Sequence, residues 1–144
     1  MTAARAALLA LLADFPGRLA DAAHAAGGRP VAAGEWAPRD VVRHLVAVDV
    51  EVFARRLDQL AAEGHPRWSW VEPGLWSGPG DDSLDGALAA FAARRSATVE
   101  RLAALDDAGW SRAGSHTVFG VLDVADLLRI AVDHDAEHLA QIRG

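Results

Sequence analysis

The chain has 144 residues, of which 51% are hydrophobic, and 20 acidic residues against 14 arginines give it a formal net charge of −6. This length suits one domain, residues 1–144, with a single core. The lack of cysteine excludes disulfides, thiolate ligands and a cysteine nucleophile. Scattered arginines on an acidic chain argue against nucleic-acid binding. No apolar run approaches the roughly 18–20 residues of a membrane span, and no signal-peptide cleavage pattern is present. We therefore expect a cytoplasmic protein that binds neither membranes nor nucleic acids.

Residues 2–26 have a helical composition that only Pro16-Gly17 interrupts. A proline inside a helix costs about 3 kcal/mol. The sequence therefore predicts a short helix near 3–13, then a break or kink. Asp14 can cap a second helix that ends at Gly27-Gly28.

After a loop at 29–37, Pro38 suits the first turn of a helix that should run to about Ala62. Apolar side chains recur on it at intervals of three and four and form one buried face. His44 lies within that face. Its members are Val41, His44, Leu45, Val48, Val52 and Phe53.

The connection over 63–82 is long for a compact domain and contains Trp68, Trp70 and Trp76. Long connections without a periodic pattern are often functional. The three tryptophans predict that this segment packs onto the helices as a lid.

Ser83 can cap a third helix that ends near Asp106, and Asp123 can cap a last helix that runs to about Ile142. Residues 107–122 form a second long connection. No strand pattern competes with the helices. The fold class is therefore all-α, most simply a four-helix bundle.

His134 and His138 lie four residues apart on the last predicted helix, so both imidazoles can point at one atom. Apolar neighbours place this face inside the bundle: Leu127, Ile130, Ala131 and Leu139. A catalytic zinc site usually takes three protein ligands. His44, on a second inward face, is the third candidate, and together these histidines predict a metal site.

The heights of the histidines favour one topology. His44 lies about 9 Å from the start of its helix and His138 about 6 Å from the end of the last one. They meet if these two helices are antiparallel, which an up-down-down-up order provides. The 63–82 connection can span about 66 Å, more than the roughly 37 Å of the preceding helix, and can therefore cross the bundle.

Two other metal sites fit the residues poorly. His134 to His138 matches the inverted zinc-protease motif H-x-x-E-H, but only six residues follow to supply its further ligand. A di-iron carboxylate bundle needs two Glu-x-x-His pairs and a glutamate from each of two other helices, and Asp135-x-x-His138 is only one weak imitation of such a pair. His24, His65 and His116 have no matching partners, and His116 is expected to form hydrogen bonds within a loop.

Residues 34–45, 110–116 and 134–142 together resemble the DinB/YfiT-like superfamily over essentially the whole chain. Ala37 departs from the serine or threonine common there, which removes a helix cap. The resemblance implies a four-helix bundle that binds zinc or nickel through His44, His134 and His138. It also implies transferase or isomerase chemistry with a low-molecular-weight thiol such as bacillithiol, mycothiol or glutathione.

We therefore expect a divalent-metal-dependent enzyme that joins such a thiol to a small electrophile. The alternative is a non-catalytic metal-binding or stress-response module whose metal is structural. A small-molecule substrate is the expected partner. The sequence does not decide between a monomer and a homodimer. Four carboxylates are candidates for orienting the imidazoles: Asp49, Glu51, Asp133 and Asp135.

Overall fold

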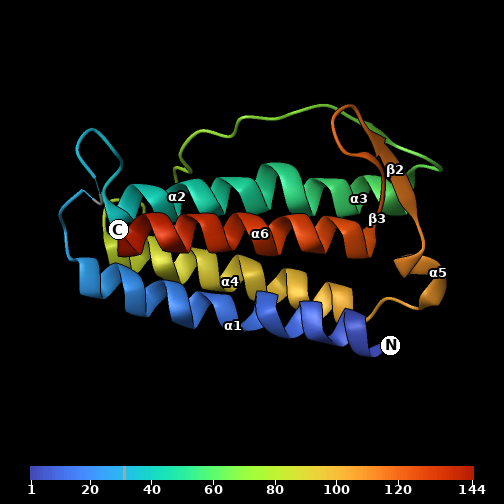
Figure 1. Cartoon of the computed structure of the whole chain (residues 1–144), viewed down its shortest axis with the longest axis horizontal. Coiled ribbons are helices and arrows are strands. Elements are labelled where there is room, and N and C mark those ends of the chain that lie inside the picture. Colours follow the sequence, from blue (N-terminus) through green and yellow to red (C-terminus); the bar gives the residue numbers. More distant parts are fainter. Residues whose placement is uncertain (31) are drawn as a thin grey trace.

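The computed structural model describes residues 1–30 and 32–144, so the loop expected at 29–37 includes one position outside the described residues. Four long helical segments lie side by side (Figure 1). They are α1 (Ala3–Ala26), the continuous run of α2 (Pro38–Val48), η1 (Asp49–Ala54) and α3 (Arg55–Ala62), α4 (Leu84–Ala103), and α6 (Val124–Arg143).

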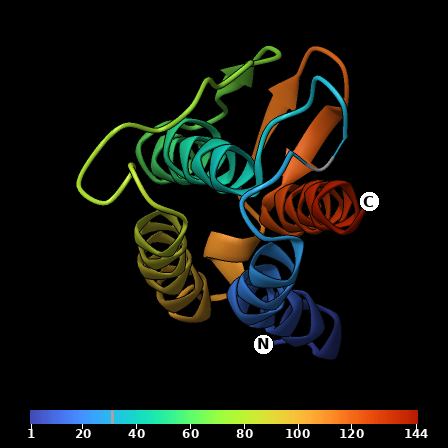
Figure 2. The same ribbon diagram turned by 90° about the vertical axis from the view of Figure 1, so that its left-hand side faces the viewer.

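In Figure 1, the α2–α3 run and α4 point in one direction, whereas α1 and α6 point in the other. The connection between α3 and α4 travels back along the bundle to make this possible. Helix α1 packs on α4 and α6, and α2 packs on α4. Seen along the axis, the segments surround a common core (Figure 2). Among the described helices, none has the length and apolarity that crossing a bilayer requires.

Of the break or kink predicted near Pro16, the break is wrong, because α1 continues through this residue. A prolyl nitrogen carries no hydrogen, so the carbonyl of Leu12 loses its usual helical donor. The guanidinium of Arg95, on α4, donates to that carbonyl at 3.1 Å instead. Asp14 consequently lies inside the helix and caps nothing, while Gly27, with φ of 72°, ends it as predicted.

The second helical run has its predicted bounds, and Ala37 makes no side-chain cap, as expected. Its middle, however, is the six-residue π-helix η1. A π-helical turn takes in an extra residue. The face that α3 presents is therefore rotated relative to an uninterrupted α-helix.

The all-α expectation is incomplete, because a small sheet joins the two long connections. Strand β1 (Arg67–Trp68) pairs in parallel with β2 (Ala113–His116), which pairs in antiparallel fashion with β3 (Gly120–Asp123). Strands of two and four residues are too short for a period-two pattern to reveal them. The sheet lies on the side of α2–α3 and α6 that faces away from α1 and α4 (Figure 2).

The predicted caps of the later helices are confirmed. Ser83 accepts from the backbone N–H of Gly86, and Asp123 forms a reciprocal capping box with Asp126. Helix α4 ends a few residues before the predicted Asp106, which instead caps the short helix α5 (Asp107–Trp110).

An ion-pair network crosses the bundle core. Arg95, on α4, is 2% exposed and donates to both carboxylate oxygens of Asp49 and of Asp135, at distances of 2.8–3.3 Å. Burial lowers the pKa of the guanidinium, but the hydrogen bonds and charges of the two carboxylates outweigh this and raise it. With the carbonyl of Leu12, the network joins α1, η1, α4 and α6.

Gly114→Ala is expected to destabilise the protein by about 1–3 kcal/mol, because an added Cβ would overpack this part of β2. The Cβ would lie 2.6 Å from the Trp68 ring and 2.8 Å from the carbonyl of Pro66. Urea denaturation would measure the loss. Gly28→Ala, where nothing lies within 4 Å, is the matched control. Equal stability of the two variants would contradict the close packing of β1 against β2.

Candidate metal centre

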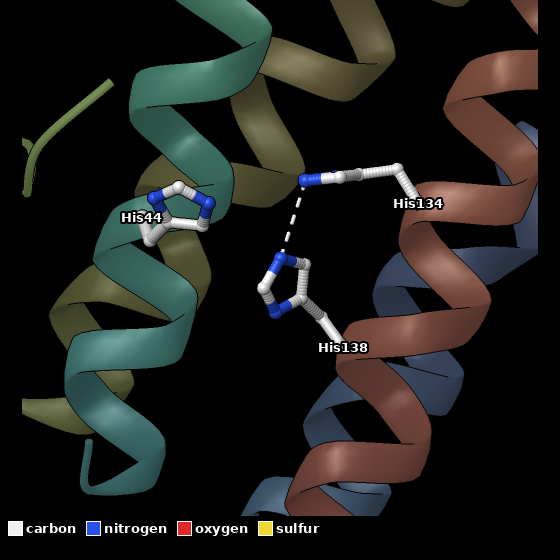
Figure 3. Close-up of side chains that lie close together, drawn as sticks. All are labelled: His44, His134 and His138. Carbon is white, nitrogen blue, oxygen red and sulfur yellow. Dashed lines mark hydrogen bonds between the residues drawn. The ribbon is translucent and has the colours of Figure 1, made fainter. Parts of the chain in front are cut away.

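His44 of α2 faces His134 and His138 of α6 (Figure 3). One ring nitrogen from each of the three residues lies within 4.8 Å of the others. The Nε2 atoms of His134 and His138 are 3.2 Å apart. The structure therefore brings together the three histidines that the sequence singled out.

The spacing of these nitrogens suits a shared metal ion. Zinc–nitrogen bonds of about 2.0–2.1 Å at a tetrahedral angle place two ligand nitrogens about 3.3 Å apart. The 3.2 Å between His134 and His138 matches this value. His44 approaches from the other helix, so an ion held by all three would join α2 to α6 (Figure 3).

The imidazoles of His44 and His134 are held in the neutral form that metal binding requires. Burial, followed by the charges of His138, His44 and Arg95, lowers the pKa of His134 to about 4. Burial and the neighbouring His138 also lower the pKa of His44. Both rings therefore present a free lone pair at pH 7.

Neutral hydrogen-bond acceptors orient two of the rings. The Nδ1 of His138 donates to the side-chain oxygen of Gln141 at 2.8 Å, and the amide of Gln141 donates in turn to Glu35 at 2.9 Å. The Nδ1 of His44 lies 3.4 Å from the carbonyl of Gly74. These bonds leave each Nε2 available to a metal.

The four carboxylates expected to orient the imidazoles form no hydrogen bond to them within the described residues. Asp49 and Asp135 are bound to Arg95, which satisfies their oxygens. Glu51 and Asp133 are exposed, and neither hydrogen-bonds to an imidazole within the described residues. Arg95, on the buried face of α4, is the partner of Asp49 and Asp135 that the sequence-based expectation overlooked.

The remaining histidines lie outside the cluster, as the sequence suggested. His24 pairs with Asp85 at 2.7 Å, and His65 lies 2.6 Å from the hydroxyl of Ser115. The Nδ1 of His116 accepts the backbone N–H of Val118 at 3.0 Å, which is the predicted hydrogen-bonding role.

A cavity of about 340 Å³ opens beside the cluster, with His44 and His134 in its wall. Its lining is mostly apolar, as is usual for small-molecule sites. The connection that we expected to act as a lid supplies residues 70–73 to this wall. Trp68 of that connection is buried, but Trp70 is 58% exposed. The segment thus forms one side of the cavity.

A family model described as the DinB superfamily matches residues 1–142. The chain belongs to the DinB superfamily. Among solved structures it is similar to YfiT from Bacillus subtilis, with a TM-score of 0.76 and 21% sequence identity over 99% of this chain and 86% of YfiT. YfiT is described as a probable metal-dependent hydrolase with an unusual four-helix bundle topology. No curated protein matches the sequence.

In its metal-free form, this DinB-superfamily protein is expected to lose the stability that neutral His134 contributes as the pH falls from about 6.5 to about 4. The pKa of His134 is about 4 in the folded protein and about 6.5 in an unfolded chain, so only the unfolded chain binds this proton in the window. The contribution of His134 to stability therefore rises with pH across this range. Thermal melts with chelator at pH 7 and pH 5 would measure the effect. His134→Gln should reduce the pH dependence, and an unchanged dependence would contradict the assignment.

Proposed function

We propose that this chain is a metal-dependent enzyme acting on a small molecule, with zinc or nickel held by His44, His134 and His138. The observation that carries the proposal is the position of the cluster at an apolar cavity. Three neutral imidazoles are suitable ligands for either ion. A purely structural site would gain nothing from opening onto such a cavity.

A divalent ion on these ligands would lower the pKa of bound water towards 7 or hold a thiol as a thiolate. The chain has no cysteine, so any thiol must come from a small molecule. We favour transfer of a low-molecular-weight thiol, or isomerisation assisted by one. In the transfer reaction, sulfur forms a bond to an electrophilic carbon, the leaving group departs with its electron pair, and the thiol proton passes to solvent. A cytoplasmic location, where thiols stay reduced, fits this chemistry.

Hydrolysis is the second candidate reaction. The similarity to YfiT, described as a probable metal-dependent hydrolase, supports it. Asp133 and Glu137 also line the cavity on the same helix as His134, where a carboxylate can accept a proton from water. Turnover of ester or amide substrates without any thiol would favour hydrolysis over thiol transfer.

Turnover by the metal-loaded protein of a panel of thiols and electrophiles is expected to depend on the cavity wall. Val71→Trp adds bulk to that wall and should lower turnover at least about tenfold through lost substrate positioning. Ser77→Trp lies in the same connection but outside the lining and serves as the control. Metal content should be equal in both variants. No turnover by any metal-loaded form would favour the alternative of a structural metal in a stress-response module.

A further inference from the structure

Arg56, at the start of α3, is a buried cation in the wall of the same cavity. The residue is 8% exposed, and its guanidinium lies over the ring of Trp68, 5.5 Å from the ring centre. One of its nitrogens donates to the carbonyl of Ser69 at 3.3 Å. A guanidinium has five N–H donors. Most of the hydrogen-bonding capacity of Arg56 is therefore left for something inside the cavity.

Among the described residues, no carboxylate balances the charge of Arg56. Within residues 1–30 and 32–144, no acidic oxygen lies within ion-pair distance of Arg56. Burial lowers the pKa of the guanidinium without any opposing acidic contribution. A buried charge is costly unless it is paired. Arg95 shows the contrast, because it is also buried but binds two carboxylates.

The acidic residues of the cavity belong to its other end. Glu72 accepts the indole N–H of Trp70, and its charge acts on His44. Asp133 and Glu137 lie on α6 on either side of His134. The cavity thus has carboxylates, His44 and His134 at one end, and at the other a guanidinium that has no carboxylate partner among the described residues.

His116 adds a second donor to the cationic end. Its Nδ1 accepts the backbone N–H groups of Val118, at 3.0 Å, and Phe119, at 3.4 Å. A neutral imidazole that accepts at Nδ1 carries its proton on Nε2. His116 lines the cavity, and burial and the charge of nearby Arg56 lower its pKa. The ring therefore remains a neutral donor.

The π-helix η1 is what brings Arg56 to the face that carries His44. Twelve positions along a regular α-helix would place Arg56 about 120° around the axis from His44. One extra residue absorbed by the π-helical turn reduces this angle to about 20°. Val48 and Val52 lie between them along the same wall. The π-helix thus aligns the candidate metal centre, an apolar surface and a cation in one cavity.

We propose that Arg56 and His116 form a binding site for the carboxylate of a small substrate whose apolar body lies against Val48, Val52 and Ile130. A guanidinium matches a carboxylate with two parallel hydrogen bonds, and the Nε2–H of His116 can supply a third. The proposal deepens the proposed function and rests on it only for the chemistry at the histidine end. The carboxylate can belong to the thiol or to the electrophile, and the test below separates them.

The test compares 4-phenylbutyrate with its neutral analogue 4-phenylbutan-1-ol. Binding to the purified chain, as isolated and after chelator treatment, is followed by the fluorescence of Trp70 and the other tryptophans. The wild type should bind the acid at least about tenfold more tightly than the alcohol, in both forms. Arg56→Met should bring the two affinities within about threefold of each other while the affinity for the alcohol stays unchanged.

Two further variants make the comparison specific. Arg55→Met removes the same charge from an exposed neighbour and should retain the full preference for the acid. Arg56→Lys keeps the charge without the planar guanidinium and should retain part of the preference. Equal affinities of the wild type for acid and alcohol would overturn the proposal, even if Arg56→Met failed to fold. A preference that survives in Arg56→Met would also overturn it.

Binding measured on the chelator-treated protein tests the anion site in the absence of metal. The result therefore distinguishes a failure of this proposal from a failure of the proposed function. If turnover is absent but the preference for the acid is intact, the anion site is supported and the proposed enzymatic function is not. On zinc-loaded protein, 6-mercaptohexanoate and 6-mercaptohexanol identify the source of the carboxylate. If 4-phenylbutyrate displaces 6-mercaptohexanoate, the thiol carries the group. If both bind together, the electrophile carries it.

Discussion

Replacing Arg95 by methionine is expected to destabilise the protein by about 3–5 kcal/mol, the usual cost of removing one partner from a buried ion pair. The substitution keeps an apolar side chain of similar length in the core but leaves Asp49 and Asp135 buried without a cation. It also removes the donor to the carbonyl of Leu12, which Pro16 already deprives of its helical partner. Urea denaturation at pH 7 would measure the change.

Two comparisons give this prediction its control. Arg94→Met, at the exposed neighbouring position, should change stability by less than about 0.5 kcal/mol. Combining Arg95→Met with Asp49→Asn and Asp135→Asn removes all three charges and should recover part of the loss. If Arg95→Met were as stable as Arg94→Met, the network would not hold the four helices together.

Chelation is expected to lower the melting temperature of the wild type much more than that of His44→Ala. In the wild type, an ion on three histidines joins α2 to α6 and stabilises the fold by about 2.7 kcal/mol at 100 times its dissociation constant. In His44→Ala, the remaining ligands, His134 and His138, lie on one helix and no link between helices is left. Differential scanning fluorimetry with and without chelator would measure both shifts.

His24→Ala is the matched control, because His24 lies outside the cluster and pairs with Asp85. It should respond to chelator as the wild type does. The metal-free forms of wild type and His44→Ala should melt at similar temperatures. An equal response of His44→Ala and wild type to chelator would mean that His44 is a core histidine and not a ligand.

Local rules predicted the parts of this protein that depend on neighbours in sequence. The spacing of His134 and His138 places both rings on one helical face, and Ser83 and Asp123 cap their helices as their chemistry requires. The position of His44 could be judged because helix rise converts residue number into height. The candidate metal cluster could therefore be predicted from the sequence alone.

The missed features depend on distant partners. The continuation of α1 through Pro16 relies on a donor 79 positions further along the chain, at Arg95. A signal for the network was present, since Arg95 falls between Phe91 and Thr98 on the buried face of α4. An arginine there requires carboxylates, and Asp49 and Asp135 are the buried ones. The role of Arg56 was hidden because a regular helical period turns it away from His44.

Metal content per chain tests the central claim most directly. Protein loaded with zinc or nickel, then freed of excess ion, should contain one ion per wild-type chain by elemental analysis. His134→Ala and His138→Ala each remove one of three ligands and should retain far less, while His65→Ala, outside the cluster, should match the wild type. Full occupancy in either His134→Ala or His138→Ala, or no bound ion in the wild type, would contradict a metal centre on these three histidines.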